Sequence, residues 1–136
     1  MGLEENKSVV RRVYQLCTEK NLTELFDCYD PVYIEHTSRG DLPLEALKQT
    51  TQMFFSAFPD SSFTVLNMVA EGDKVAYQII IKGTHQGPFM GLEPTGRKIE
   101  MHDTSIKRIL GGKFRESWGT IDSLSLMQQL GLIPKP

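Results

Sequence analysis

The chain has 136 residues, which is enough for one domain with a buried core. Hydrophobic residues make up 40% and charged residues 24%, as in ordinary globular proteins and unlike disordered ones. The formal net charge is -2 and the Lys and Arg residues are scattered, whereas nucleic-acid binding requires a concentrated cationic face. Residues 1–5 lack a signal-peptide pattern and no apolar run reaches membrane-spanning length, so we expect a cytoplasmic protein that binds neither nucleic acid nor membrane.

Two helices are predicted at the start of the chain. Apolar residues recur at three- and four-residue spacings from Val9 to about Lys20, which is typical of an amphipathic helix. Asn21 can end this helix and allow a short second helix to begin after it. The same region contains Cys17 and Cys28, whose spacing fits neither a zinc site nor a redox pair. We expect buried, reduced thiols, with a disulfide as the alternative.

A short extended segment and a long helix are expected next. Pro31 ends the second helix, because proline disfavours the helical conformation in the residue before it. Residues 32–36 alternate in type, which predicts an extended segment. Asp41 can cap a third helix, whose apolar residues continue at helical spacing to Phe58.

Antiparallel strands are expected from Ser62 onward, where the hydrophobic period changes from helical to alternating. Tight turns separate strands that we place at residues 63–70, 74–83, 97–110 and 113–122. Residues 84–96 are rich in Gly and Pro and predict a long ordered loop, which in a small domain is usually functional. Ser123 can begin a short C-terminal helix. Helices followed by antiparallel strands indicate the α+β class, and a twisted sheet packed on helices leaves a cone with a cavity.

Several motifs together resemble one known family. They are the runs Gly83-Thr84-His85-Gln86-Gly87, Pro94-Thr95-Gly96-Arg97 and Leu126-Met127-Gln128-Gln129-Leu130-Gly131, with Glu116, Trp118 and Asp122 between them. This combination resembles the SnoaL-like polyketide cyclase and ester cyclase family over nearly the entire chain. The resemblance implies the cone-shaped nuclear transport factor 2-like fold, with N-terminal helices packed on a curved antiparallel sheet in a single domain, 1–136.

The resemblance also implies an activity. Cyclases of this family close a ring by intramolecular aldol condensation of a polyketide ester, without metal or bound cofactor. An aspartate on the last strand removes a proton beside a carbonyl, and the resemblance assigns that role to Asp122. Relatives often carry an acidic residue in the preceding strand where this chain has Ser105.

The position of Asp122 allows two interpretations. A period of two on the last strand puts one set of side chains on the face that we expect to point inward, namely Phe114, Glu116, Trp118, Thr120 and Asp122. A carboxyl group in an apolar cavity has a raised pKa, which suits a general acid or base near neutral pH. Alternatively, Asp122 caps the helix that begins near Ser123.

The three histidines lie on separate segments. His36 is expected to face the interior and to position a substrate carbonyl or orient Asp122, although a structural role is the alternative. His102 is a second candidate for positioning the substrate oxygen, and a cross-strand pair with Glu116 or Trp118 is the alternative. His85 is expected at a turn or rim. We expect no metal site, because nothing in the sequence brings the three histidines together.

The remaining candidates are apolar or paired residues. We expect a substrate-binding group that includes, beside Glu116, the residues Trp118, Tyr14, Phe54, Phe58 and Met101, although most of these side chains can equally be plain core. For Glu116 the simpler interpretation is an ion pair with Arg108.

Three functions remain open at this point. The leading hypothesis is a cofactor-independent cyclase or isomerase that acts on a small apolar or polyketide-like ligand. The second is a non-catalytic binder of such a ligand, and the third is a protein-interaction module. Apolar residues on both sheet faces predict a homodimer through the sheet, with Leu66, Met68 and Ile80 opposite Phe63, Val65 and Ile79.

Overall fold

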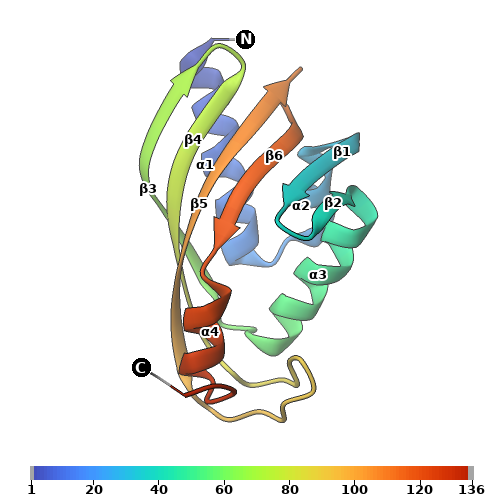
Figure 1. The fold of residues 1–136 in the computed structure, drawn as a ribbon. Coiled ribbons are helices and arrows are strands. Elements are labelled where there is room, and N and C mark those ends of the chain that lie inside the picture. Colours follow the sequence, from blue (N-terminus) through green and yellow to red (C-terminus); the bar gives the residue numbers. More distant parts are fainter. Residues whose placement is uncertain (1, 135–136) are drawn as a thin grey trace.

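A computed structural model describes residues 2–134, and Figure 1 shows helices packed against a strongly curved sheet. The elements in chain order are α1 (Leu3–Glu19), α2 (Leu22–Asp27), β1 (Tyr29–Thr37), β2 (Gly40–Pro43), α3 (Leu44–Ala57), β3 (Ser62–Glu71), β4 (Lys74–Thr84), β5 (Lys98–Leu110), β6 (Lys113–Ile121) and α4 (Ser123–Gln129). The predicted α+β class and the curved sheet with N-terminal helices are therefore confirmed.

The strands form one sheet in the order β2-β1-β6-β5-β4-β3. Every neighbouring pair is antiparallel except β1 and β6, which run parallel. The predicted antiparallel pairing of β3 through β6 is confirmed, and β1 joins these strands by a parallel pairing that we did not predict. A parallel pairing needs a long connection, and α3 with four intervening strands supplies it.

Strand β2 lies where we expected the third helix to begin. It forms a tight hairpin with β1, in which Thr37 pairs with Gly40 and the Thr37 hydroxyl donates to the Gly40 carbonyl at 2.7 Å. Gly40 has a φ of 116°, which favours glycine. Because Asp41 and Pro43 belong to β2, α3 begins at Leu44 and not at a cap on Asp41.

The helices cover one face of the sheet, which we call the inner face, and the opposite face is the outer face. Helix α1 buries Val10, Val13 and Tyr14 against β3 and β4, and it ends where Lys20 adopts a left-handed conformation. Helix α3 packs on β1 and β2, as Figure 1 shows. The two cysteines are buried and free, which confirms the predicted reduced thiols.

Two β-bulges change which side chains point inward. In β6, Arg108 of β5 pairs with Glu116 whereas the adjacent Ile109 pairs with Phe114, so Arg115 is an extra residue. A second bulge lies in β3. Since side chains alternate along a strand, one extra residue reverses the faces of all residues beyond it. The register shift in β6 determines which of its side chains face the candidate site.

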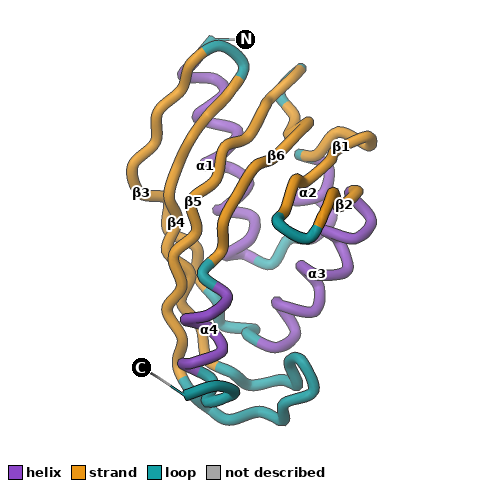
Figure 2. The backbone as a smooth tube through the Cα atoms, in the orientation of Figure 1, coloured by secondary structure: helices purple, strands orange, loops and turns teal. Residues whose placement is uncertain are grey.

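The predicted long loop between β4 and β5 is confirmed. Figure 2 shows it in teal at the lower end of the molecule. It is anchored to the end of α3, because the backbone N–H groups of Gln86 and Gly87 both donate to the Ala57 carbonyl. Gly87 is required there, since a Cβ atom would lie 2.4 Å from the Ser56 carbonyl oxygen. Within residues 2–134, no helix combines the length and hydropathy needed to cross a membrane.

Candidate active site on the inner face

A group of polar side chains lies on the inner face of the central strands. Register brings Lys107 of β5 opposite Ser117 of β6, and Ser117 opposite Glu35 of β1. Two further members of the same face, Asp103 and Ser105, alternate with Lys107 along β5. We call these five residues the interior cluster.

Lys107 is the most deeply buried charged residue of the interior cluster, with only 5% of its surface exposed. Its ammonium group donates to the Ser117 hydroxyl at 2.6 Å and to the Ser105 hydroxyl at 3.2 Å. It also lies 5.6 Å from the centre of the Phe114 ring, where a cation is attracted to the ring face.

The charge of Lys107 is maintained by its surroundings. Burial by itself lowers the pKa of Lys107, but nearby groups outweigh this effect and raise the pKa above its ordinary value of 10.5. These groups are the hydroxyls of Tyr77 and Tyr33, followed by the carboxyls of Glu35 and Asp103. The two tyrosine hydroxyls are themselves neutral near pH 7, because burial raises their pKa values. Lys107 is therefore a buried cation.

Asp103 has the partial burial and the raised pKa that are expected of an acid or base catalyst. Its side chain is half-buried, and burial raises its pKa from 3.8 to about 6. The Lys107 cation lowers this pKa and the Glu35 carboxylate raises it, but both effects are smaller than that of burial. A carboxyl group with a pKa near 6 can accept and return a proton near neutral pH.

Tyrosine hydroxyls complete the polar part of the interior. Those of Tyr14 and Tyr77 lie 2.5 Å apart, and the Tyr33 hydroxyl donates to Glu35 Oε1 at 3.0 Å. Burial, the largest effect in each case, raises the pKa of all three tyrosines. They are therefore neutral hydrogen-bonding groups. Tyr14, predicted to line a cavity, lies beside the interior cluster as part of this hydroxyl pair.

Small residues separate Asp103 from Lys107. Ser105 lies between them on β5 and pairs with Gly119 of β6. A Cβ atom on Gly119 would lie 3.1 Å from Ser105 Oγ, so a larger residue would crowd this strip of the inner face. On the other side of Ser105, Tyr77 of β4 is its direct partner, and both Ser105 and Lys107 are buried.

The predicted catalytic residue Asp122 occupies a different environment. Its side chain is exposed, and its Oδ1 accepts a hydrogen bond from the backbone N–H of Ser125 at 3.0 Å. The alternative interpretation, a cap on α4, is therefore confirmed. The expected enclosed apolar position is wrong, because the bulge at Arg115 breaks the simple alternation along β6.

The same bulge places Glu116 and Trp118 on the outer face, opposite Arg108 and Ile106. The expectation that they line the interior is wrong. The predicted ion pair between Glu116 and Arg108 is confirmed, with Glu116 Oε1 3.5 Å from Arg108 Nη1.

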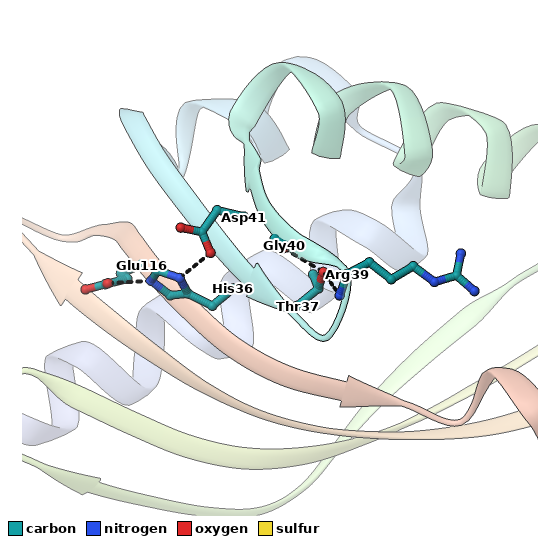
Figure 3. Close-up of polar contacts among 6 residues, drawn as sticks. All are labelled: His36, Thr37, Arg39, Gly40, Asp41 and Glu116. Carbon is teal, nitrogen blue, oxygen red and sulfur yellow. Dashed lines mark hydrogen bonds and ion pairs between the residues drawn. The ribbon is translucent and has the colours of Figure 1, made fainter.

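His36 also lies on the outer face and not in the interior. Figure 3 shows its ring between Asp41 and Glu116, with Nδ1 2.8 Å from Asp41 Oδ1 and Nε2 2.6 Å from Glu116 Oε2. These two hydrogen bonds raise the pKa of His36 above 6.5, and the bond to His36 lowers that of Glu116. The ring stacks on Trp118 with centres 5.3 Å apart. His36 is thus a central member of an outer-face ionic network.

His102 is exposed on the outer face and lies 3.5 Å from Glu100 of its own strand. The expected cross-strand partners, Glu116 and Trp118, pair with other positions of β5. Neither His102 nor His36 therefore shares a face with Asp103.

His85, expected at a rim, is wholly buried beside Phe58. Its Nδ1 accepts a hydrogen bond from the Thr95 backbone N–H, whereas its Nε2 has no partner among the described residues. Of the apolar candidates, Phe58 and Met101 are buried core, and Phe54 is half-buried and packed against that core.

Sequence reasoning missed Asp103, Lys107 and Glu35. A signal was available in β5, because the inward positions Met101 and Ile109 extend by a period of two through Asp103 and Lys107. By contrast, the bulge at Arg115 has no sequence pattern that we could have used. Glu35 becomes recognisable only once β1 is known to pair with β6.

Two surface hollows lie away from the interior cluster. One, of about 420 Å³, lies where α1 and α2 meet the turn between β5 and β6 and includes Arg12 and Cys28. The other, of about 430 Å³, surrounds Arg97 and the segment after α4. Within residues 2–134, no three His, Cys, Asp or Glu side chains gather in a metal-binding arrangement.

Comparison with solved structures finds close likenesses. AclR of Streptomyces galilaeus, proposed to be a hydroxylase, is 27% identical with a TM-score of 0.93, and the match covers 99% of this chain and 86% of that one. IdmH of Streptomyces antibioticus, proposed to be a polyketide cyclase, is 27% identical with a TM-score of 0.81, covering 93% and 98%. TsrD of Streptomyces laurentii, at 24% identity, 98% and 99% coverage and a TM-score of 0.86, shows the shared fold.

Among curated protein sequences, none matches this chain significantly. The sequence model of the family described as SnoaL-like polyketide cyclase matches residues 7–130, which span α1 through α4. The chain belongs to the SnoaL-like polyketide cyclase family.

Proposed function

We propose that the protein catalyses an intramolecular aldol-type ring closure of a polyketide-like ester, with Asp103 as the acid and base. The observation that carries this proposal is the half-buried carboxyl group of Asp103 on the inner face, whose pKa burial raises to about 6. Membership of a family of polyketide cyclases supports the substrate class.

The proposed reaction needs only one group that moves a proton. The Asp103 carboxylate removes a proton from a substrate carbon flanked by carbonyls, and the C–H electrons form an enolate. The enolate carbon then forms a C–C bond to a second carbonyl carbon of the same molecule, whose π electrons move onto its oxygen. That alkoxide takes the proton back from Asp103, so the product of ring closure is an isomer of the substrate.

Asp103 and Asp122 are the two candidates for this role. Register places Asp103 directly opposite Ile121, so Asp122 follows at the same end of the sheet. The family resemblance favours Asp122, whereas burial and the raised pKa favour Asp103. Asp122 is exposed and already accepts a hydrogen bond as a helix cap. We therefore assign the proton transfer to Asp103.

The experiment compares D103N and D122N with the wild type on a synthetic 1,3-dicarbonyl ester that can cyclise, with product formation followed by liquid chromatography and mass spectrometry. Acid–base catalysis typically contributes about 100-fold or more, so D103N should lose about that factor in kcat. D122N retains the cap and should stay within a few-fold of the wild type. Full turnover by D103N would remove Asp103 from the mechanism.

The likeness to AclR makes hydroxylation the alternative outcome of the same assay. Hydroxylation requires an oxidant such as O₂ and an electron donor, and its product gains the mass of one oxygen atom. An aldol product before loss of water keeps the substrate mass. Tight binding without either product would instead support a non-catalytic binding protein.

We also propose that two copies of the chain pair through the outer face. Val69 is 66% exposed there and Ile106 is 40% exposed, and a pairing of two copies through this face would bury both side chains. Light scattering of the wild type should give a dimer mass, and I106E should shift it toward the monomer. A monomer mass for the wild type in dilute solution would contradict this pairing.

A further inference from the structure

We infer that the long loop between β4 and β5 is held closed by an acid-sensitive clasp, in which the neutral imidazole of His85 accepts hydrogen bonds from Thr95, and that protonation of this imidazole releases the loop. The clasp is this contact between His85 and Thr95. Neither residue belongs to the interior cluster, so the inference is independent of the proposed ring closure. It assigns a conformational role to a loop that the candidate active site leaves without one.

The hydrogen bonds of the clasp determine the protonation state of His85. The backbone N–H of Thr95 donates to His85 Nδ1 at 3.2 Å, so this nitrogen carries no proton. The Thr95 hydroxyl lies 3.0 Å from the same nitrogen and therefore donates to it as well. An imidazole with an unprotonated Nδ1 carries its proton on Nε2. His85 is thus neutral, with a defined tautomer.

The clasp joins the two ends of the loop. His85 is its first residue after β4, and Thr95 lies three residues before β5. Two backbone hydrogen bonds of 2.9 Å flank the clasp, one from the His85 N–H to the Arg97 carbonyl and one from the Gly96 N–H to the His85 carbonyl. The side-chain contact and the backbone bonds close the loop at the same place.

The closed loop covers an aromatic part of the core. Phe89, in the middle of the loop, packs against Phe58 with ring centres 5.4 Å apart and against Phe54 at 6.3 Å. The His85 ring lies 5.5 Å from that of Phe58. Phe58 is wholly buried. Release of the loop would therefore expose this aromatic group at the end of α3.

Protonation of His85 is incompatible with the closed clasp. The residue is 0% exposed, and its Nε2 has no hydrogen-bond partner among residues 2–134. A protonated imidazole has N–H donors at both nitrogens, so its Nδ1–H would face the Thr95 N–H. Such a cation would also be buried without a partner, which is costly. Only the open loop lets water solvate the charge, so opening binds a proton and becomes easier as the pH falls.

The charged groups of the neighbouring segments do not compensate a charge on His85. Asp60, which follows α3, accepts hydrogen bonds from the N–H and the hydroxyl of Thr84, both at 2.7 Å. The Arg97 guanidinium is directed to the Gln129 carbonyl at 3.4 Å. Among residues 2–134, the ion pairs of histidine rings involve the other two histidines and not His85. The remaining charged residues of the loop and its flank are exposed, namely Glu93 and Lys98.

The test isolates His85 from the other histidines. The chain has three histidines, and the variant H36N/H102N keeps only His85. Amide hydrogen exchange followed by NMR, corrected for the pH dependence of intrinsic exchange, gives opening constants for the bonded loop amides of Gln86, Gly87 and Gly96. Uptake of one proton changes such a constant by up to about tenfold per pH unit. From about pH 7 to about pH 5, where histidines change charge, the opening constant should rise about tenfold or more.

The matched variant adds H85N to the same background. The asparagine Oδ1 takes the place of Nδ1 and accepts from Thr95, but it does not bind a proton near neutral pH. Opening constants of H36N/H85N/H102N should therefore agree within about twofold between the two pH values. Asp103, whose pKa burial raises to about 6, is present in both variants and cannot cause a difference between them.

A second measurement applies if the triple variant does not fold. Nitrogen-15 NMR of the single imidazole in H36N/H102N at about pH 7 distinguishes the two tautomers. The clasp requires an unprotonated Nδ1 and a protonated Nε2. The opposite tautomer would overturn the inference.

The outcomes of the exchange experiment decide between release of the loop and other causes. A rise confined to the loop amides and absent after H85N supports the clasp. An opening constant of H36N/H102N that does not change with pH, or one that changes equally after H85N, would overturn it. An equal rise for the paired amides of β3 and β4 would also overturn it, because the whole protein and not the loop would then be opening.

Discussion

Lys107 and Ser117 are direct cross-strand partners, and the lysine ammonium group donates to the serine hydroxyl across 2.6 Å. The same serine pairs on its other side with Glu35 of β1. Three strands thus place a buried cation, a hydroxyl and a carboxylate in one row of the inner face. The position of β1 beside β6 is therefore essential to the electrostatics around Asp103.

The neighbours of Asp103 should shift its pKa in opposite directions. Lys107 lowers this pKa and Glu35 raises it. If the carboxylate is the base, kcat/KM rises with pH through the pKa of Asp103. K107M should move this rise to higher pH and E35Q to lower pH, as measured in pH profiles of kcat/KM. Shifts of the same sign in both variants would contradict the assigned electrostatics.

The contributions of the Tyr14 and Tyr77 hydroxyls to the free energy of unfolding should depend on each other. Removing one hydroxyl leaves the other buried without its partner, which costs about 1–3 kcal/mol. Y14F and Y77F should each lower the free energy of unfolding by about this amount, whereas the double variant should lose less than the sum. Urea denaturation measures all four proteins. Simple additivity would show that the two hydroxyls do not depend on each other.

The outer-face network should make stability depend on the charge of His36. Its folded pKa lies above 6.5 because of the bonds to Glu116 and Asp41. The stabilisation is therefore fully present below about pH 6.5, while Glu116 remains ionised, and is lost as the pH rises through the folded pKa. The melting temperature of the wild type should exceed that of H36N more at about pH 6 than at about pH 9. A pH-independent difference would contradict this assignment.

Asp122 should contribute to stability through its cap on α4. D122A should lower the free energy of unfolding by about 1 kcal/mol, because the Ser125 backbone N–H loses its acceptor. D122N and D122S keep a capping oxygen and should remain within about 0.5 kcal/mol of the wild type. Chemical denaturation compares the three variants. An unchanged stability in D122A would mean that the cap contributes nothing measurable.

The sequence predicted the architecture better than the site, for physical reasons. Helical and alternating periods identified most elements, and the resemblance fixed the family. The error at Trp118 and Glu116 came from one extra residue, Arg115, because a bulge reverses the faces without changing the local pattern. Strand β2 was missed because it has only four residues, and because Asp41 within it is also a residue type that begins helices.

Asp103 could have been recognised and was not. Its alternation with Met101 and Ile109 is visible in the sequence, but the adjacent His102 is of the residue type that acts most often as a general acid or base. By contrast, the partners of His36 on β2 and β6 depend on strand neighbours that only the fold provides. Residues that share a face of one strand can thus be predicted from the sequence, whereas contacts between residues on different strands require the fold.

The pH profile of kcat/KM for D103N and D122N tests the central assignment most directly. The wild type should gain activity through an apparent pKa near 6, the value to which burial raises that of Asp103. D103N should lack this rise and have low activity at all pH values, while D122N should keep the rise. An unchanged rise in D103N together with its loss in D122N would contradict the account and return the proton transfer to the last residue before α4.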